Sequence, residues 1–234
     1  MNQKNYAIVI PVLNEEKRVG NGILELEKFI FSQLKNYLIK VVIVDGGSVD
    51  KTVEIVKKFQ QNFSNLYLKI SKKGKGRQLK KVFSEEETDF FIQMDVDLAV
   101  PLKYLKELIF WLEKDYDIVI GSRLKKQSEV KRTFIRKALG RGYSFLVRLL
   151  FQKPILDYQC GFKGFQGKKL KSILSEVKDK NWIFDTELIL KGLKKGFKIK
   201  EIPVEWEEKT GSKLNILKQT FSMFFSLLKL RFKM

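Results

Sequence analysis

Short apolar runs alternate with segments of helical periodicity along most of the chain. The apolar runs are rich in β-branched residues and predict buried strands at 6–10, 41–44, 66–70, 117–123 and 199–204, with another from 90 to Asp97. Helical spacing of leucine, isoleucine and phenylalanine predicts helices between them, at 14–38, 51–59, 77–84 and 101–112, and one that opens within 182–187 and runs to about 195. This alternation predicts an α/β fold with a mostly parallel central sheet flanked by helices.

The run Phe90–Met94 ends abruptly in Asp95 and Asp97. If the strand stays extended through Asp97, both carboxylates point to one face, because side chains alternate with a period of two. Two like charges on one face are unfavourable without a cation between them, and Mg²⁺ or Mn²⁺ accepts such carboxylates together with water and substrate phosphates. The alternative is that the pair is only the polar end of a core strand.

Two further polar clusters follow predicted strands, at Pro11–Glu15 and at Asp45–Ser48. Ligands of parallel α/β sheets bind outside the carboxyl ends of the strands, so these clusters should meet Asp95 and Asp97 at one site. Neither a G-x-G-x-x-G fingerprint nor a G-x-x-x-x-G-K-[ST] loop occurs. A dinucleotide site or a P-loop of the usual kind is therefore not expected.

Composition narrows the chemistry further. The 234 residues suffice for one large domain, and the formal net charge of +19 favours a polyanion, an anionic membrane or phosphorylated substrates. The absence of histidine excludes Ser-His-Asp and Cys-His catalysis and leaves only oxygen ligands for a metal. The single cysteine, Cys160, excludes an internal disulfide and fits a reducing cytoplasm. We expect no signal peptide and no transmembrane helix.

The last segment has the pattern of one amphipathic helix. Its apolar face carries Leu217, Phe221, Phe224, Phe225, Leu228 and Phe232, and lysines and serine lie opposite. Such a helix usually packs on a core, but its phenylalanines and flanking lysines favour a position at a membrane interface.

The ordered motifs resemble those of the inverting GT-A glycosyltransferases of family 2. They are Pro11-x-x-Asn14-Glu15, Asp45-x-Gly47-Ser48-x-Asp50-x-Thr52, Lys73-Gly74-Lys75-Gly76, Asp95-x-Asp97 and Gly121-Ser122-Arg123. Three later blocks resemble the branch that glycosylates dolichyl or other polyprenyl phosphates: Asp157-x-Gln159-Cys160-Gly161-Phe162-Lys163, Trp182-x-Phe184-Asp185-x-Glu187 and Gly211-Ser212-Lys213. The resemblance covers about residues 6 to 214. One departure is Gly46, where many relatives carry a second aspartate.

The resemblance implies a GT-A domain at 1–205, with a nucleotide-sugar half at about 1–100 and an acceptor half at 101–205. An acceptor loop and a membrane-surface helix would follow at 206–234. It implies nucleotide-sugar contacts from Pro11, Asn14, Glu15, Asp45, Gly47, Ser48, Lys75, Gly76, Asp95 and Val96, and an Mg²⁺ or Mn²⁺ ion on Asp95 and Asp97. Asp157 and Asp185 would be the catalytic carboxylates, and the acceptor phosphate would lie on Arg123, Arg132, Ser212 and Lys213.

For several of these residues a structural role is the alternative. Asn14 and Asp185 also suit N-caps of the helices that follow them, and the lysines around Gly74 suit a solvated turn. Asp157 and Asp185 would orient the sugar or the acceptor or give weak base assistance. Cys160 is interpreted as a packed residue, since no base partner is visible.

The implied reaction moves a hexose from a nucleotide diphosphate, with UDP-glucose favoured, to a polyprenyl or dolichyl phosphate. The enzyme would act as a peripheral protein on the cytoplasmic face of an anionic membrane. Alternatives are a GDP-mannose donor or another lipid or glycan acceptor. A nucleic-acid-binding protein is disfavoured, because acidic residues at successive strand ends would repel a phosphate backbone.

Overall fold

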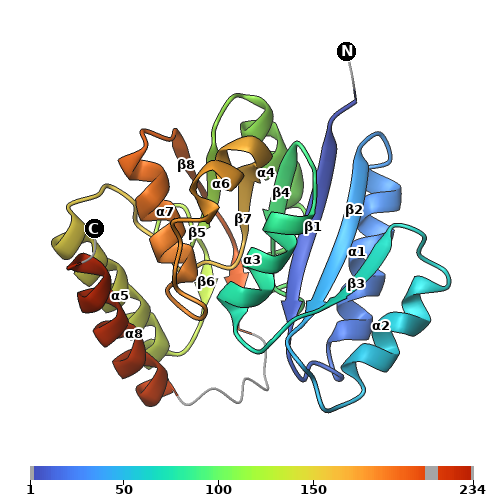
Figure 1. Cartoon of the computed structure of the whole chain (residues 1–234), viewed down its shortest axis with the longest axis horizontal. Coiled ribbons are helices and arrows are strands. Elements are labelled where there is room, and N and C mark those ends of the chain that lie inside the picture. Colours follow the sequence, from blue (N-terminus) through green and yellow to red (C-terminus); the bar gives the residue numbers. More distant parts are fainter. Residues whose placement is uncertain (1–2, 209–215, 233–234) are drawn as a thin grey trace.

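A seven-stranded sheet forms the centre of the computed structural model, which describes residues 3–208 and 216–232, without the side chains of 216–221 (Figure 1). The strand order is β3-β2-β1-β4-β7-β5-β8, and only β7 runs antiparallel to its neighbours. The strands are β1 (Asn5–Val12), β2 (Leu38–Asp45), β3 (Leu66–Ile70), β4 (Phe90–Gln93), β5 (Ile118–Ser122), β7 (Lys163–Gln166) and β8 (Ile199–Pro203). The predicted α/β class with a mostly parallel sheet is confirmed.

Helices cover both faces of the sheet, and a small parallel pair of β6 (Val130–Lys131) and β9 (Trp206–Glu207) lies apart from it. The helices are α1 (Val19–Gln33), α2 (Thr52–Gln60), α3 (Lys75–Glu85), α4 (Tyr104–Glu113), α5 (Phe134–Phe151), α6 (Gly167–Leu174), α7 (Phe184–Lys194) and α8 (Ile216–Arg231). No helix among the described residues is long and apolar enough to cross a bilayer.

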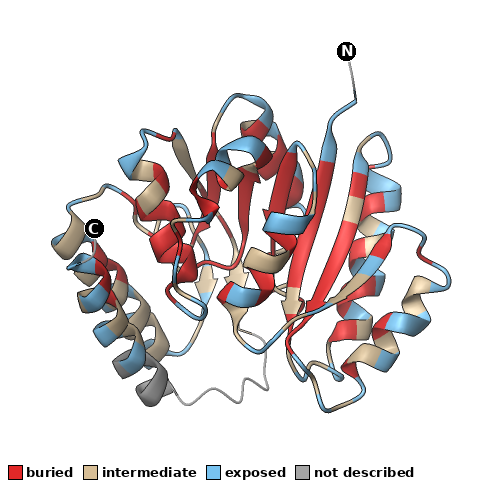
Figure 2. Cartoon of the chain, viewed as in Figure 1, coloured by how far each residue is buried: buried red, intermediate tan, exposed pale blue. Residues whose placement is uncertain are grey.

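The period of two along the strands divides the core into two layers (Figure 2). In β1, Ile8 and Ile10 pack under α1, α2 and α4, whereas Ala7 and Val9 face the layer that contains α3, α6 and α7. Because both faces of the strands are covered, their sequences read as continuous apolar runs.

The strand β7 escaped the sequence analysis, because Lys163–Gln166 lacks a β-branched pattern. Its antiparallel direction matters for the site. An antiparallel strand begins where its parallel neighbours end, so the loop 157–162 reaches the edge at which β4 and β5 terminate.

Several predicted boundaries were wrong. The first helix ends at Gln33 rather than near Leu38, which already belongs to β2. Pro11 does not stop β1, which continues to Val12. Proline is tolerated there because the pairing of β1 with β4 ends at Val9, so no partner on that side requires the missing N–H.

The strand β4 ends at Gln93 and does not stay extended through Asp97, contrary to the prediction. Asp97 accepts a hydrogen bond from the backbone N–H of Ala99 (3.1 Å), and Leu98 adopts a left-handed φ of 52°. The two aspartates therefore lie in a turn, and it is this turn that places their carboxylates.

Candidate active site

The loops after β1 and β2 are joined by hydrogen bonds from the predicted nucleotide-binding residues. Asn14, with φ 55°, donates its N–H to Ser48 Oγ (2.8 Å) and accepts from the N–H of Val49 through Oδ1 (2.9 Å). The prediction that Asn14 caps a helix beginning there was wrong, because α1 begins at Val19. Glu15 donates its N–H to Thr52 Oγ1 (2.8 Å) and pairs through its carboxylate with Arg18.

Asp45 is buried and uses both carboxylate oxygens to shape its own turn. Oδ2 accepts from the N–H groups of Gly47 (2.7 Å) and Ser48 (2.9 Å), and Oδ1 accepts from Ser48 Oγ. Gly47 has a φ of 90°, which favours glycine. Both carboxylate oxygens of Asp45 are therefore used to hold the conformation of its own loop.

Gln78 was missed by the sequence analysis, although it ties the two loops to α3. Its buried amide donates to the carbonyl oxygens of Val12 and Val44, both at 2.7 Å. A Cβ on Gly46 would lie 3.0 Å from Gln78 Nε2, so glycine at this position leaves room for the Gln78 side chain. No local pattern marks Gln78, because its partners lie 66 and 34 residues away.

The carboxylates of Asp95 and Asp97 each lie near a cation. Lys75 Nζ is 2.9 Å from Asp95 Oδ1, and Arg18 Nη1 is 3.9 Å from Asp97 Oδ2. Burial and then the Asp95 charge raise the pKa of Asp97. Burial would also raise the pKa of Asp95, but Lys75 outweighs it and lowers that pKa.

The donor set at Asp95 and Asp97 fits a hard divalent ion. Two carboxylates that repel each other, with no histidine or thiolate beside them, suit Mg²⁺ or Mn²⁺ completed by water and phosphate oxygens. Among the described residues no group of three or more ligating side chains forms, so substrate oxygens would have to complete the shell. Val96, between them, is buried, and both its carbonyl oxygen and its side chain pack against Gly22, so its side chain is not available to a nucleotide.

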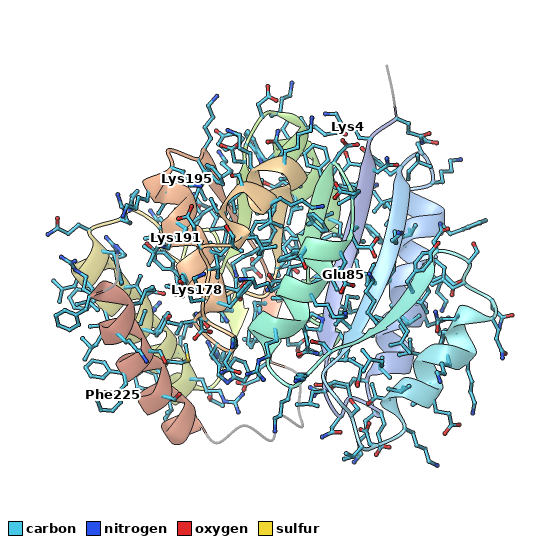
Figure 3. The ribbon with its side chains drawn as sticks, in the orientation of Figure 1. Lys4, Glu85, Lys178, Lys191, Lys195 and Phe225 are labelled. Atoms are coloured by element: carbon cyan, nitrogen blue, oxygen red, sulfur yellow. The ribbon has the colours of Figure 1, made fainter. Side chains whose placement is uncertain are left out.

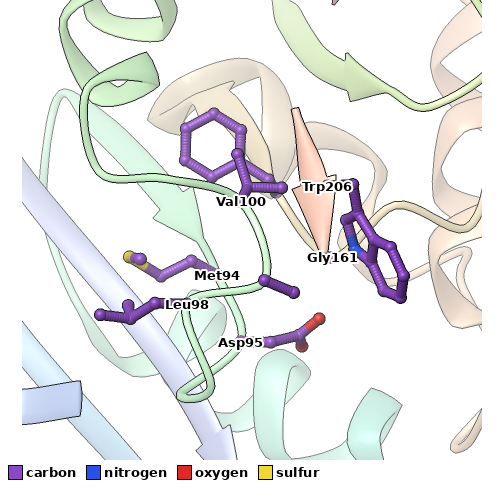
Figure 4. Close-up of a pocket in the computed structure, with 8 residues that line it drawn as sticks. Met94, Asp95, Leu98, Val100, Gly161 and Trp206 are labelled. Carbon is purple, nitrogen blue, oxygen red and sulfur yellow. The ribbon is translucent and has the colours of Figure 1, made fainter. Parts of the chain in front are cut away.

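A small pocket lies directly beside Asp95 (Figure 4). Gly161 closes one side so tightly that a Cβ there would lie 2.0 Å from Asp95 Oδ2. Trp206, from β9, forms another wall. The full lining is Met94, Asp95, Leu98, Ala99, Val100, Gly161, Phe162 and Trp206.

Replacing Gly161 by alanine is expected to displace the Asp95 carboxylate, because the new methyl group and Oδ2 cannot share the same space. If a divalent ion binds at Asp95, Mn²⁺ binding measured by calorimetry should weaken at least about tenfold, as loss of a charge-assisted contact implies. Gly142→Ala on α5 is the matched control, since a Cβ there meets no atom within 4 Å. Unchanged binding in Gly161→Ala would contradict the placement of Asp95.

Asp157 and Arg123 form a buried ion pair on the other side of the site. Arg123 Nε and Nη2 donate to the two carboxylate oxygens at 2.8 and 2.9 Å, and the Arg123 N–H adds a bond of 3.0 Å. Burial alone would raise the pKa of Asp157, but Arg123 and then Lys163 lower it to about 2. A carboxylate held in this way is a poor proton acceptor, and its geometry favours a role in positioning Arg123.

Asp185 lies in the first turn of α7, which begins at Phe184, so it is not the N-cap. Its Oδ2 is 3.3 Å from Gln93 Nε2 and 3.7 Å from the buried Lys163 Nζ, whereas its buried Oδ1 has no partner among the described residues. Burial lowers the pKa of Lys75, but the charges of Asp95 and, next, Asp185 outweigh it and raise that pKa. Lys75, Asp95 and Asp185 therefore lie close enough to interact electrostatically.

Two other motif residues have structural roles. Gly76 packs against 180–184, where a Cβ would lie 2.8 Å from both Lys180 C and Phe184 Cβ. Cys160 is buried, and burial raises the pKa of its thiol to about 11, which agrees with a packed residue rather than a nucleophile.

A second pocket, strongly basic, lies beyond Trp206. Arg123 and Arg132 stack over the Trp206 ring, with guanidinium carbons 5.7 and 5.2 Å from its centroid. Both arginines line this pocket together with Leu124, Val130, Lys137, Gly140 and Arg141. Lys137, Gly140 and Arg141 belong to α5 and were not predicted, and Trp206 was not recognised as a site residue.

Arg132 lines this pocket with an unsatisfied guanidinium nitrogen among the described residues. Its buried Nε has no partner among the described atoms, and burial, followed by the charge of Arg123, lowers its pKa. Nearby Arg136 is already paired with Glu208. Ser212 and Lys213, predicted to bind the same phosphate, lie outside the described residues.

Known proteins share this architecture. Glucosyl-3-phosphoglycerate synthase from Mycobacterium tuberculosis, solved with UDP, superposes with a TM-score of 0.74 at 16% identity over 97% of this chain and 80% of that one. A second structure of that enzyme, with Mn²⁺, UDP-glucose and glycerol 3-phosphate, gives a TM-score of 0.72 at 14% identity, covering 97% and 80%. The fold is therefore GT-A-like.

Residues 7–174 match the model of glycosyl transferase family 2, and the chain belongs to this family. It is 32% identical to dolichyl-phosphate beta-glucosyltransferase ALG5D of Trichomonas vaginalis, over 90% of this chain and 68% of that protein. The human dolichyl-phosphate beta-glucosyltransferase is 30% identical over 90% and 70%. Glycosyltransferase AglD of Haloferax volcanii is 28% identical over 95% of this chain, which spans only 36% of AglD. The chain is thus a family 2 glycosyltransferase that resembles the dolichyl-phosphate glucosyltransferases.

Proposed function

We propose that this enzyme transfers glucose from UDP-glucose to the phosphate of a polyprenyl or dolichyl lipid at a membrane surface, with inversion. The observation that carries the proposal is the position of Trp206. This side chain lines the pocket beside Asp95 and also stacks on Arg123 and Arg132, which line the basic pocket. A site for a diphosphate and a site for a second anion therefore share one wall.

The donor half would hold the nucleotide sugar at the loops after β1 and β2. A divalent ion on Asp95 and Asp97 would supply Lewis-acid stabilisation of the leaving diphosphate. Lys75 lies in the first turn of α3 within reach of Asp95, so its ammonium can also bind diphosphate oxygens. The unpartnered Oδ1 of Asp185 is a candidate acceptor for a hydroxyl of the transferred sugar.

The acceptor half would need no general base. A phosphate monoester has a second pKa of about 6, so it is largely a dianion at neutral pH and attacks without help. This agrees with a chain that lacks histidine and with an Asp157 carboxylate whose pKa is about 2. Arg132 would bind the phosphate, and Asp157 would hold Arg123 beside it.

The test supplies purified protein with Mn²⁺, polyprenyl phosphate and radiolabelled UDP-glucose or GDP-mannose in parallel. We expect organic-soluble label from UDP-glucose, and none when polyprenol replaces the phosphate, because the nucleophile is then missing. Label from GDP-mannose alone would establish the mannosyl alternative. Transfer to diacylglycerol or a glycan, but not to polyprenyl phosphate, would overturn the acceptor assignment.

Arg132→Ala should raise the KM for polyprenyl phosphate roughly tenfold to a hundredfold, because a charge-assisted contact with the phosphate is lost. Binding of UDP and Mn²⁺ should stay unchanged, since Arg132 lies in the other pocket. Lys58→Ala, which removes an exposed cation on α2, is the control and should leave the KM for the lipid as it is. An unaltered acceptor KM in Arg132→Ala would contradict the phosphate site.

A further inference from the structure

Large apolar side chains that face solvent are concentrated on α5 and at the end of α8. Among the described residues, eight such side chains are at least 62% exposed. Five of them belong to these two helices, which lie side by side at one end of the molecule (Figure 1), and a sixth, Phe232, directly follows α8. Only Phe31 and Val49 lie elsewhere. The six are Phe134, Ile135, Phe145, Leu149, Phe225 and Phe232.

With about 100° of rotation per residue, the side chains of α5 fall into three separate stripes along the helix. One stripe packs inward: Val147 is buried, and Leu146 and Leu150 lie in the same core layer as Leu227 and Leu230 of α8. A second stripe, of Phe134, Phe145 and Leu149, spans an arc of about 60° and faces solvent. A helix in contact with water alone would carry polar side chains there.

The third stripe of α5 is cationic. Lys137, Arg141 and Arg148 fall within an arc of about 40° that borders the exposed apolar stripe. The helix contains no acidic residue, and none of these three cations has an ion-pair partner within 3–208 and 216–232. Their charge is therefore available to an external anionic surface.

We propose that α5 is the element that lies on an anionic lipid bilayer. Phe134, Phe145 and Leu149 would enter the boundary between headgroups and acyl chains, and the cationic stripe would contact the lipid phosphates. The helix α8 packs beside α5, with Leu227 and Leu230 in the same core layer as Val147, and adds Phe225, which projects outward (Figure 3).

This orientation assigns a route to the acceptor. Lys137 and Arg141 belong to the cationic stripe and also line the basic pocket with Arg132. A lipid phosphate in the headgroup layer would thus reach that pocket without leaving the bilayer. The route rests on the proposed function, whereas the lipid contact does not.

The test measures co-sedimentation of the full chain with phosphatidylcholine vesicles that contain phosphatidylglycerol. The test variant is Phe145→Glu/Leu149→Glu, and Phe31→Glu is the control because Phe31 is 83% exposed on α1, away from this face. We expect the test variant to bind vesicles at least tenfold more weakly and the control to bind as the wild type does. Binding of the wild type should fall with added salt and on neutral vesicles. Circular dichroism checks that each variant is folded.

Transfer to a short-chain polyprenyl phosphate in detergent separates this inference from the proposed function. The test variant should retain it, because neither replaced residue lines a pocket. If the wild-type protein binds vesicles but transfers no sugar to polyprenyl phosphate, the proposed acceptor is wrong, whereas the contact of α5 with the bilayer still holds. Equal vesicle binding by wild type and test variant would overturn the inference. So would a wild type that binds no vesicles but forms a dimer that the test variant dissociates, because this face would then be a contact between protein copies.

Discussion

Replacing Asp97 by asparagine is expected to lower kcat/KM for sugar transfer by roughly a thousandfold, the scale on which a metal stabilises a leaving diphosphate. The substitution keeps the shape of the side chain and its hydrogen bond to the Ala99 N–H but removes the charge. Electron paramagnetic resonance should show that Mn²⁺ no longer binds together with UDP. We choose Asp97 because its nearest cation, Arg18, is 3.9 Å away, whereas Asp95 is in contact with Lys75 at 2.9 Å.

Asp115→Asn is the matched control for this variant. Asp115 is exposed in the turn after α4, and asparagine tolerates its left-handed φ of 60°. Its activity and Mn²⁺ binding should equal those of the wild type. Full activity in Asp97→Asn would remove the metal from the proposed mechanism.

Asp157→Ala should destabilise the fold by about 3–5 kcal/mol, because it leaves the Arg123 guanidinium buried without its counter-charge. Urea unfolding measures the change. The double variant Arg123→Met/Asp157→Leu should lose less than either single variant, since it leaves no buried charge unpaired. Glu54→Ala, at an exposed pair on α2, is the control and should leave the urea midpoint close to that of the wild type.

The contribution of Asp157 should depend on pH in a defined direction. Its pKa falls from the ordinary 3.8 to about 2 on folding. The stabilisation is therefore fully present above about pH 5 and is lost progressively as the pH falls toward 2. The stability difference between wild type and Asp157→Ala should shrink over that interval, and a constant difference would show that the charge of Asp157 is not what stabilises the fold.

The sequence by itself determined the class of fold and the positions of most strands. Continuous β-branched runs such as Val41–Val44 need burial on both faces, and the helices between them impose parallel neighbours. That reasoning correctly placed the acidic clusters at one edge of the sheet. It could also identify the family, because motif order and spacing are properties of the chain alone.

Only the tertiary structure decided how those residues are used. The pairing of Arg123 with Asp157 joins positions 34 apart, and it depends on β7 entering the sheet antiparallel between β4 and β5. The same insertion brings Gly161 against Asp95. Local periodicity contains no information on strand order, so these contacts, and the placement of Trp206 between the two pockets, could not be read from the sequence.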